Sequence, residues 1–192
     1  MRESCKVYAF EPVVENYKLL RANCILNDMD EINVFNIGLS DKKAAVNIRV
    51  DYNNMASSRV EDNILDEHRE NYTDYVRAQF ITLNEHIKSE GIDINEIVGI
   101  WIDTEGHEPE IFFGGSEIFS QCDAPVYMEF NPAVYRNKGV YDSFLRELMK
   151  IYSFFICWED YAKGKSEKRL ITDLPRVEDE MDNVFCNLLL LK

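Results

Sequence analysis

The chain has 192 residues, 46% hydrophobic and 29% charged, which suits a globular protein with a sizeable core and predicts a single domain over residues 1–192. Its 21 basic and 35 acidic side chains give a net charge of −14, which argues against partners bound through phosphates, such as nucleic acid or an anionic membrane. No apolar stretch near the N-terminus suits a signal peptide, and the longest apolar run, 188–191, is too short to cross a bilayer, so we expect a cytoplasmic protein.

The cysteines are odd in number and widely spaced, at Cys5, Cys24, Cys122, Cys157 and Cys186. No CxxC pair and no Cys/His ligand spacing occurs among them. We therefore predict reduced thiols that pack as small hydrophobic side chains, rather than disulfides or metal ligands.

A short strand and a helix are predicted first. Val7–Phe10 is an apolar run that ends at Glu11, and Pro12 suits a first helical turn, where its missing N–H costs nothing. The apolar residues that follow have helical spacing: Val13, Tyr17, Leu20 and Cys24.

The next predicted strands are Asn33–Ile37 and Ala44–Val50, with a turn at Gly38–Asp41 between them. Their spacing predicts that the two strands form an antiparallel ribbon. Residues 51–74 are polar and acidic, so we interpret them as a surface insertion, partly helical from Glu61 onward, that suits a lid facing a substrate.

In the middle of the chain, Phe80–Leu83 predicts a short strand, and Asn84–Glu90 a short helix that stops at Gly91. Ile97–Ile102 is continuously apolar and rich in β-branched residues. This composition is typical of a parallel strand covered on both faces, so we expect the central strand of the sheet here.

The remaining elements continue the alternation of strands and helices. We predict a helix over 106–119 that Gly114-Gly115 can break, a strand at 126–130, a helix at 141–152, and final strands at 154–158 and 184–191. Residues 163–182 are expected to form a loop between these last two strands. The rhythm predicts an α/β fold with an open, mostly parallel sheet, helices on both faces and an antiparallel C-terminal edge.

Acidic side chains follow several of the predicted strands: Glu11, Asp41, Asp103 with Glu105, and Glu129. Such acids also cap helix N-termini, but ligands of open α/β sheets bind outside the carboxyl ends of strands. Glu11 suits recognition of two ribose hydroxyls because an ionised carboxylate offers two acceptor oxygens. Asp41 could accept a hydrogen bond from an exocyclic amine such as that of adenine.

The densest polar segment, 102–110, comes directly after the predicted central strand. Asp103 and Glu105 can point the same way, and Asp103 or His107 could act as a base where a cationic cofactor and a substrate hydroxyl meet. His107 could equally be a plain surface residue. A divalent metal held by Asp103, Glu105, His107 and Glu108 is a further alternative, but the spacing fits no recognised pattern, so we predict no metal.

Taken in order, several motifs resemble those of the FkbM family of S-adenosylmethionine-dependent methyltransferases. They are Tyr8-Ala9-Phe10-Glu11-Pro12 with Asn16 and Leu20, Gly38-Leu39-Ser40-Asp41, Thr82-Leu83, Ile102-Asp103-Thr104-Glu105-Gly106-His107-Glu108 and Gly114-Gly115. Each motif alone is modest, but the ordered set is fairly specific, and the resemblance runs from about residue 7 to about residue 130.

The resemblance implies a Rossmann-like class I methyltransferase sheet with an antiparallel last strand. It implies methyl transfer from S-adenosylmethionine, usually to an oxygen of a sugar, polyketide or other small hydroxylated acceptor. Cofactor binding would fall to Glu11, Pro12, Ser40, Asp41 and Asp103, and catalysis to Asp103, Glu105 and His107.

The sequence departs from the family in lacking an Asp-x-Gly-Ala-Asn-x-Gly type turn. Since that turn and its strand precede the position of Glu11 in the family, we expect an N-terminally truncated version of the fold. The chain would be part of a longer protein or a truncated gene product, or the strands flanking the gap would have closed up into a smaller sheet.

Two other functions remain open from the sequence. The chain could be a catalytically inactive, truncated methyltransferase-like binding module. A dehydrogenase that uses NAD would share the acid after the second strand of its fold, although the acidic 103–108 segment speaks against it.

Overall fold

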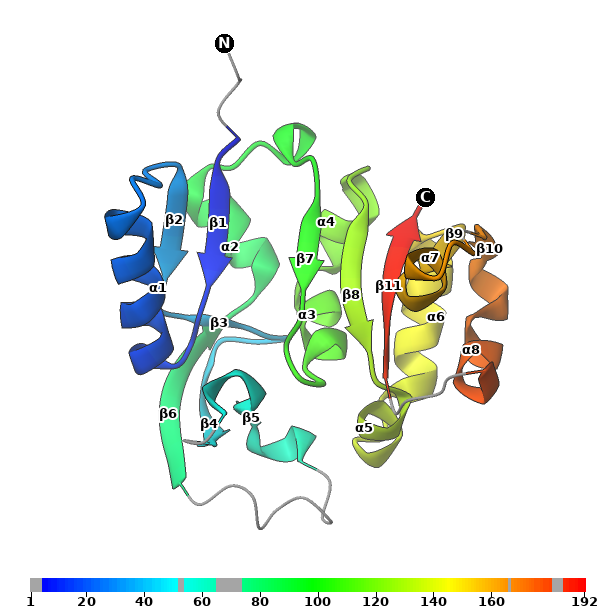
Figure 1. Cartoon of the computed structure of the whole chain (residues 1–192), viewed down its shortest axis with the longest axis horizontal. Helices are drawn as coiled ribbons and strands as arrows, with labels where there is room; N and C mark the ends of the chain where they lie inside the picture. The colour runs from blue at the N-terminus through cyan, green and yellow to red at the C-terminus, as the bar shows by residue number, and fades with distance from the viewer. Residues whose placement is uncertain (1–4, 52–53, 65–73, 166, 181–184) are drawn as a thin grey trace.

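The computed structural model describes residues 5–51, 54–64, 74–165, 167–180 and 185–192 (Figure 1). It is a mixed α/β structure in which the strands form sheets of two, four and five strands. The prediction of an α/β fold is confirmed at this level. One open, mostly parallel sheet is not what the structure contains, because most neighbouring strands of the two larger sheets are antiparallel.

The first sheet consists of β1 (Val7–Phe10) and β2 (Ile32–Phe35), which are parallel and joined by α1 (Val14–Leu26). The predicted strand and helix are confirmed, although Pro12 lies just before the helix rather than in its first turn. Val13 and Cys24 are buried, as their spacing predicts, while much of the rest of α1 is exposed.

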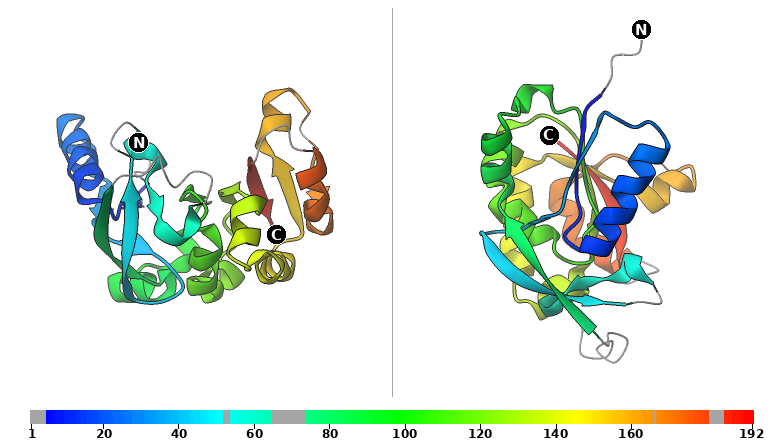
Figure 2. Two further views of the ribbon diagram at one scale, coloured as in Figure 1. Left: turned by 90° about the horizontal axis from the view of Figure 1, so that it is seen from below. Right: turned by 90° about the vertical axis from the view of Figure 1, so that its left-hand side faces the viewer.

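The second sheet has the strand order β3-β6-β4-β5. Its strands are β3 (Gly38–Leu39), β4 (Ala44–Val50), β5 (Arg59–Val60) and β6 (Asp74–Ile81). Strand β4 is antiparallel to both β5 and β6, and Figure 2 shows β4 and β6 side by side. The expected ribbon between 33–37 and 44–50 is therefore wrong, because β2 pairs with β1 and the predicted turn at Gly38 is itself a strand next to β6.

The described residues between β4 and β6 include the 3-10 turns η1 (Met55–Ser57) and η2 (Glu61–Asn63). Helical structure starts at Glu61, as predicted, but a short turn also occurs before it. Residues 65–73 of the predicted insertion lie outside the described residues.

After β6 the chain forms α2 (Leu83–Glu90). Thr82 accepts a hydrogen bond from the Glu85 backbone, and Glu85 reaches back to the Thr82 backbone, which is a complete capping box. The helix ends at Gly91 in the left-handed conformation, with φ 63°, and η4 (Ile94–Glu96) follows.

The third sheet has the order β10-β9-β11-β8-β7. Its strands are β7 (Ile100–Ile102), β8 (Val126–Phe130), β9 (Phe154–Cys157), β10 (Arg169–Leu170) and β11 (Cys186–Leu191). Strands β7 and β8 are parallel, whereas β11 is antiparallel to both β8 and β9. The antiparallel character of the last strand is confirmed.

Strand β7 lies at an edge of its sheet, so the prediction of a central strand covered on both faces is wrong. Trp101 is 70% exposed and Val98 is 72% exposed. Apolar, β-branched composition identified a strand, but the position of a strand in a sheet depends on partners far away in the sequence. Within the described residues β1 pairs with β2 alone and β7 with β8 alone, so these two strands have not closed up against each other.

The helices of the C-terminal half pack mainly on one face of the third sheet (Figures 1 and 2). On this face lie α3 (Glu108–Gly114), α4 (Ser116–Gln121), α5 (Pro132–Asn137), α6 (Tyr141–Ile151), η5 (Ile171–Asp173) and α8 (Leu174–Glu180). Helix α7 (Trp158–Ala162) instead contacts Tyr127 through Trp158. The helix predicted over 106–119 does break at Gly114-Gly115.

The predicted loop over 163–182 contains β10 and α8, which the sequence did not indicate. Leu174 and Val177 of α8 are buried in the main core, so this segment belongs to the packed structure. Helix α5 was also missed; its first turn begins at Pro132 and is capped by the Asn131 side chain.

The main core lies between these helices and β8 and β11. Val126, Met128 and Phe130 alternate along β8 and are buried against the helices, so Tyr127 and Glu129 point to the opposite face. Four of the cysteines are buried and all five are free thiols, as predicted. Among the helices of the described residues, none has the length and apolar character needed to cross a membrane.

Candidate functional site

Three carboxylates that follow predicted strands meet at the ends of β7 and β8. Asp103 and Glu105 follow β7, Glu129 lies near the end of β8, and one oxygen of each lies within 4.8 Å of the others. The register explains this, because Ile102 is level with Met128 in parallel strands and the next residues are neighbours. We call Asp103, Glu105 and Glu129 the acidic triad.

The turn that follows β7 is held in one conformation. Glu105 has a positive φ of 55°, which is uncommon for a residue other than glycine, and Gly106 has φ 93°. A methyl group at Gly106 would lie 2.6 Å from Val134 Cγ1, so the chain needs glycine there. Lys138 Nζ donates to the Gly106 carbonyl at 2.9 Å, which ties the turn to the end of α5.

Glu108 holds the same turn in place through hydrogen bonds. Its side chain is fully buried; Oε1 accepts from the backbone N–H and the hydroxyl of Thr104 at 2.9 and 2.8 Å, and Oε2 accepts from the Tyr135 hydroxyl at 2.9 Å. Burial raises the pKa of the Glu108 carboxyl above its usual value. Glu108 therefore supports the turn that carries Asp103 and Glu105.

Burial and the charges of neighbouring carboxylates both affect the pKa values of the acidic triad. The pKa of Glu129 is raised to about 8, first by burial and then by the negative charges of Glu108, Glu105 and Asp103. Burial also raises the pKa of Glu105, an effect that the adjacent Arg59 guanidinium opposes through an ion pair with Glu105. Glu129 therefore holds its proton near neutral pH unless a cation approaches.

His107 is buried, so the alternative of a plain surface residue is wrong. Its Nε2 lies 3.0 Å from Ser40 Oγ, and its ring packs edge-on against Phe80. Burial, and secondarily the charge of Lys138, lowers the pKa of His107 to about 3, so the ring stays neutral. The structure thus brings together His107 and Ser40, two predicted site residues 67 positions apart in the sequence.

Ser40 and Asp41 form the turn after β3, which packs on α3. Ser40 is buried and its hydroxyl donates to Asp41 Oδ1 at 3.2 Å. The Ser40 carbonyl approaches Gly114 so closely that a methyl group there would overlap it. This close approach fixes Asp41 at the rim of the turn, where its carboxylate is partly exposed.

Glu11 and Pro12 follow β1. Glu11 Oε1 accepts from the Val13 backbone at 2.7 Å, and burial raises the Glu11 pKa, although hydrogen bonds from Val13 and Asn16 oppose the shift. The carboxylate thus also supports the start of α1, which was the structural alternative for such an acid. Figure 1 shows β1 and β7 pointing the same way, so Glu11 and Asp103 follow their strands at the same end.

Sequence reasoning missed the supporting residues of this site. Arg59 pairs with Glu105 from 46 positions away, Asn63 reaches the Glu105 carbonyl, and Tyr135 bonds Glu108. None of them stands in a motif. The pairing of β7 with β8 was the signal that could have added Glu129 to the other two acids.

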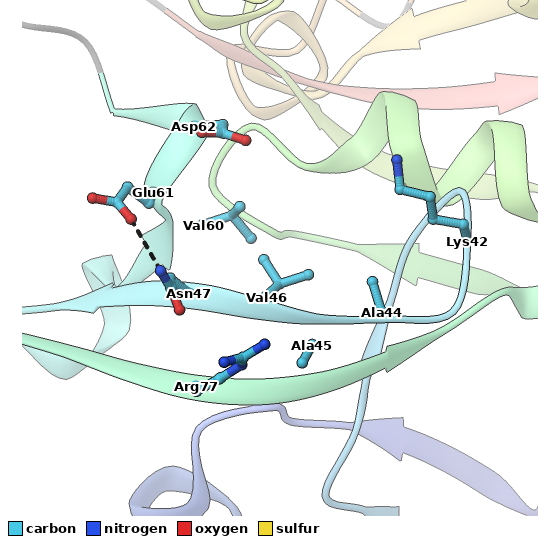
Figure 3. A pocket seen from close by; sticks show the side chains of 9 residues that line it. All are labelled: Lys42, Ala44, Ala45, Val46, Asn47, Val60, Glu61, Asp62 and Arg77. Atoms are coloured by element: carbon cyan, nitrogen blue, oxygen red, sulfur yellow. Dashed lines mark hydrogen bonds between the residues drawn. The ribbon is translucent and has the colours of Figure 1, made fainter.

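A separate surface hollow of about 410 Å³ lies along β4 and beside β5 and η2 (Figure 3). Its walls combine the small apolar side chains Ala44, Val46 and Val60 with polar ones at the rim, where Asn47 Nδ2 lies 3.4 Å from Glu61 Oε2. None of the predicted site residues lines it. The acidic triad and this hollow are therefore different places on the molecule.

Comparison with known families agrees with the motifs. The sequence profile described as the methyltransferase FkbM domain matches residues 1–156. The chain belongs to the FkbM methyltransferase family. The FkbM match includes β1 to β8 and nearly all of β9, together with every predicted site residue, and the elements from α7 onward lie beyond it. No curated protein and no solved structure gives a significant match.

Proposed function

We propose that this FkbM-family chain is a methyltransferase that uses S-adenosylmethionine and methylates a hydroxyl oxygen of a sugar or another small hydroxylated acceptor. The observation that carries the proposal is the acidic triad, gathered at the ends of adjacent strands inside the family match. The proposal includes a Rossmann-like variant of the class I methyltransferase fold in a single domain. It also includes a cytoplasmic location and no binding to nucleic acid or membrane.

The carboxylates of the site suit the proposed cofactor. S-adenosylmethionine, when bound, supplies an electrophilic methyl group on a positively charged sulfur. Carboxylates at a strand end suit such a cation, and among the described residues Asp103 has no ion-pair partner that would compete. In this proposal Glu11, with Pro12 beside it, binds the ribose hydroxyls, and Ser40 and Asp41 lie toward the adenine.

In this proposal Asp103 is the general base that accepts the proton of the acceptor hydroxyl, because Asp103 is the exposed member of the triad and can reach a ligand. Glu105 contributes negative charge next to Arg59. His107, predicted as catalytic, is neutral and faces Ser40, so its geometry favours a positioning role for the Ser40–Asp41 turn.

The test combines binding and turnover. Titration calorimetry with S-adenosylmethionine should give saturable heat, and S-adenosylhomocysteine should form with a panel of sugars and small alcohols. Asp103→Asn should lower turnover by about 10²- to 10⁴-fold, the usual contribution of a general base, and should lower turnover more than it weakens cofactor binding. Glu11→Ala should instead weaken cofactor binding by about tenfold or more, because charge-assisted hydrogen bonds are lost.

Asp123→Asn is the matched control, since it removes one carboxylate charge from a side chain that is 96% exposed and outside the site. No heat with millimolar S-adenosylmethionine would overturn the proposal and favour an inactive binding module. Small, equal effects of Asp103→Asn and Glu11→Ala would overturn the residue roles. The family match favours methyl transfer over the dehydrogenase alternative.

A further inference from the structure

The acidic triad has fewer cationic partners than carboxylates among the described residues. Arg59 pairs with Glu105, while among the described residues no cationic side chain pairs with Asp103 or Glu129. Lys138, the nearest other cation to this turn, is engaged by Glu110 at 2.6 Å and by the Gly106 carbonyl. Three carboxylate oxygens within 4.8 Å of one another thus share one counter-charge.

A buried side-chain amide beside the backbone of Glu105 also has an oxygen without a partner. Asn63, in η2, is 0% exposed, and its Nδ2 donates to the Glu105 carbonyl at 3.4 Å. Its Oδ1 is buried and has no hydrogen-bond partner in the part of the chain that the structure describes. Because a buried acceptor without a partner costs about 1–3 kcal/mol, this oxygen points to a ligand.

The four groups have the chemistry of a hard-cation site. Ca²⁺ and Mg²⁺ prefer carboxylate and amide oxygens, and Ca²⁺ takes them at about 2.3–2.6 Å. Two oxygens bound to the same Ca²⁺ lie at most about 4.6–5.2 Å apart, so separations within 4.8 Å allow the three triad oxygens to contact one ion.

We propose that Asp103, Glu105 and Glu129, with Asn63 Oδ1, bind a hard divalent cation. This set differs from the metal alternative that the sequence raised. His107 Nε2 faces Ser40, and Glu108 bonds Thr104 and Tyr135; neither side chain belongs to the group of close ligand atoms.

Cation binding itself does not depend on the proposed function, but its consequence does. If the chain transfers methyl groups as proposed, the cation would lie beside Asp103, where the acceptor hydroxyl is expected, and would hold that hydroxyl in place. Acceptors with neighbouring oxygens, which can chelate the ion, would then be preferred.

Terbium luminescence offers a local readout. Trp101 lies two residues before Asp103 on the same face of β7, and it stacks on Tyr127 with ring centroids 4.0 Å apart. Tb³⁺ bound at the triad should therefore emit when the indole is excited. We expect saturable emission that Ca²⁺ displaces, and Ca²⁺ binding should be seen independently by calorimetry.

Asp103→Asn and Glu129→Gln should each weaken Ca²⁺ binding by about tenfold or more, because ligand charge sets the affinity of oxygen sites over several decades. Asn63→Asp should strengthen it, since it replaces a neutral ligand by a charged one; a purely structural Asn63 would give no gain. Trp101→Phe should reduce the emission but leave the calorimetric affinity unchanged.

Asp123→Asn controls for the high negative charge of the whole chain and should leave the affinity unchanged. Equal weakening by Asp123→Asn and Asp103→Asn, or no displacement by millimolar Ca²⁺, would overturn the site. Circular dichroism verifies folding, and if Glu129→Gln does not fold, the exposed Asp103 decides the outcome. Because these readouts need neither cofactor nor acceptor, a failure of methyl transfer is distinguishable from a failure of cation binding.

Discussion

At the scale of single residues, buried polar side chains determine the shape of the site. Glu108 accepts hydrogen bonds from Thr104, the Gly106 backbone and Tyr135, and the Tyr135 hydroxyl also lies 3.1 Å from the Glu129 carbonyl oxygen. Each of these groups would cost about 1–3 kcal/mol if buried without its partner. The network therefore holds the turn of Asp103 and Glu105 beside β8.

His86 is a second buried polar residue, and it connects α2 to the first sheet. Its ring lies edge-on to Phe10 and Phe35, with centroids 4.7 and 4.6 Å away. Burial lowers its pKa below the usual value of 6.5, an effect that the charge of Glu90 partly opposes.

We predict a pH dependence of stability from this residue. Because the pKa of His86 is lower in the folded protein, the unfolded chain binds the proton first as pH falls, so the stabilisation present above about pH 6.5 is lost below it. Urea unfolding should show a smaller loss of stability between pH 7 and pH 5 for His86→Leu than for the wild type. The slope attributable to this one proton is at most about 1.4 kcal/mol per pH unit. Identical pH profiles would contradict the assignment.

The site could be predicted from the sequence only in part. The acids were found because they follow apolar runs, a local pattern. That Glu129 joins Asp103, or that His107 is buried against Ser40, depends on strand pairing and packing between distant segments.

At the scale of elements, glycine lets the β3 turn touch α3. Gly114 ends α3 where the Ser40 carbonyl comes close, and this contact places Ser40 against His107. Sequence reasoning assigned Gly114 to a helix break, which is correct, but the close approach of another backbone was invisible in the local sequence.

Gly114→Ala should therefore destabilise the protein by about 1–3 kcal/mol, the usual cost of adding a methyl group to a packed contact. Thermal or urea unfolding measures this change. Gly99→Ala is the matched control, because a methyl group at Gly99 meets nothing within 4 Å and should be neutral or slightly stabilising. If both variants unfold alike, the contact is not as tight as described.

At the scale of the whole molecule, the sheets differ in how well they are supported. The five-stranded sheet lies on the main core, whereas β1 and β2 form a two-stranded sheet beside a helix with exposed Leu19, Ile25 and Leu26. Two strands alone are marginally stable in water. The expectation of a further strand beside β1 stays a prediction, and both β1 and β7 have one unpaired edge among the described residues.

Hydrogen exchange should reveal this difference. We predict that amides of β1 and β2 open at a lower free energy than those of β8 and β11, because local unfolding of the first sheet exposes little buried apolar surface. Exchange followed by mass spectrometry compares both sheets in one sample, so β8 and β11 act as the internal reference. Uniform protection of all four strands would show that the first sheet is as well supported as the third.

The sequence by itself determined many of the local elements, the break at Gly114-Gly115 and the candidate acids, because spacing and turn chemistry act over a few residues. Only the tertiary structure decided that β7 is an edge strand, that β4 pairs with β6, and that Arg59 meets Glu105 across 46 positions. Burial and hydrogen bonding in the assembled fold determine these partners, and the local sequence of either segment does not predict them.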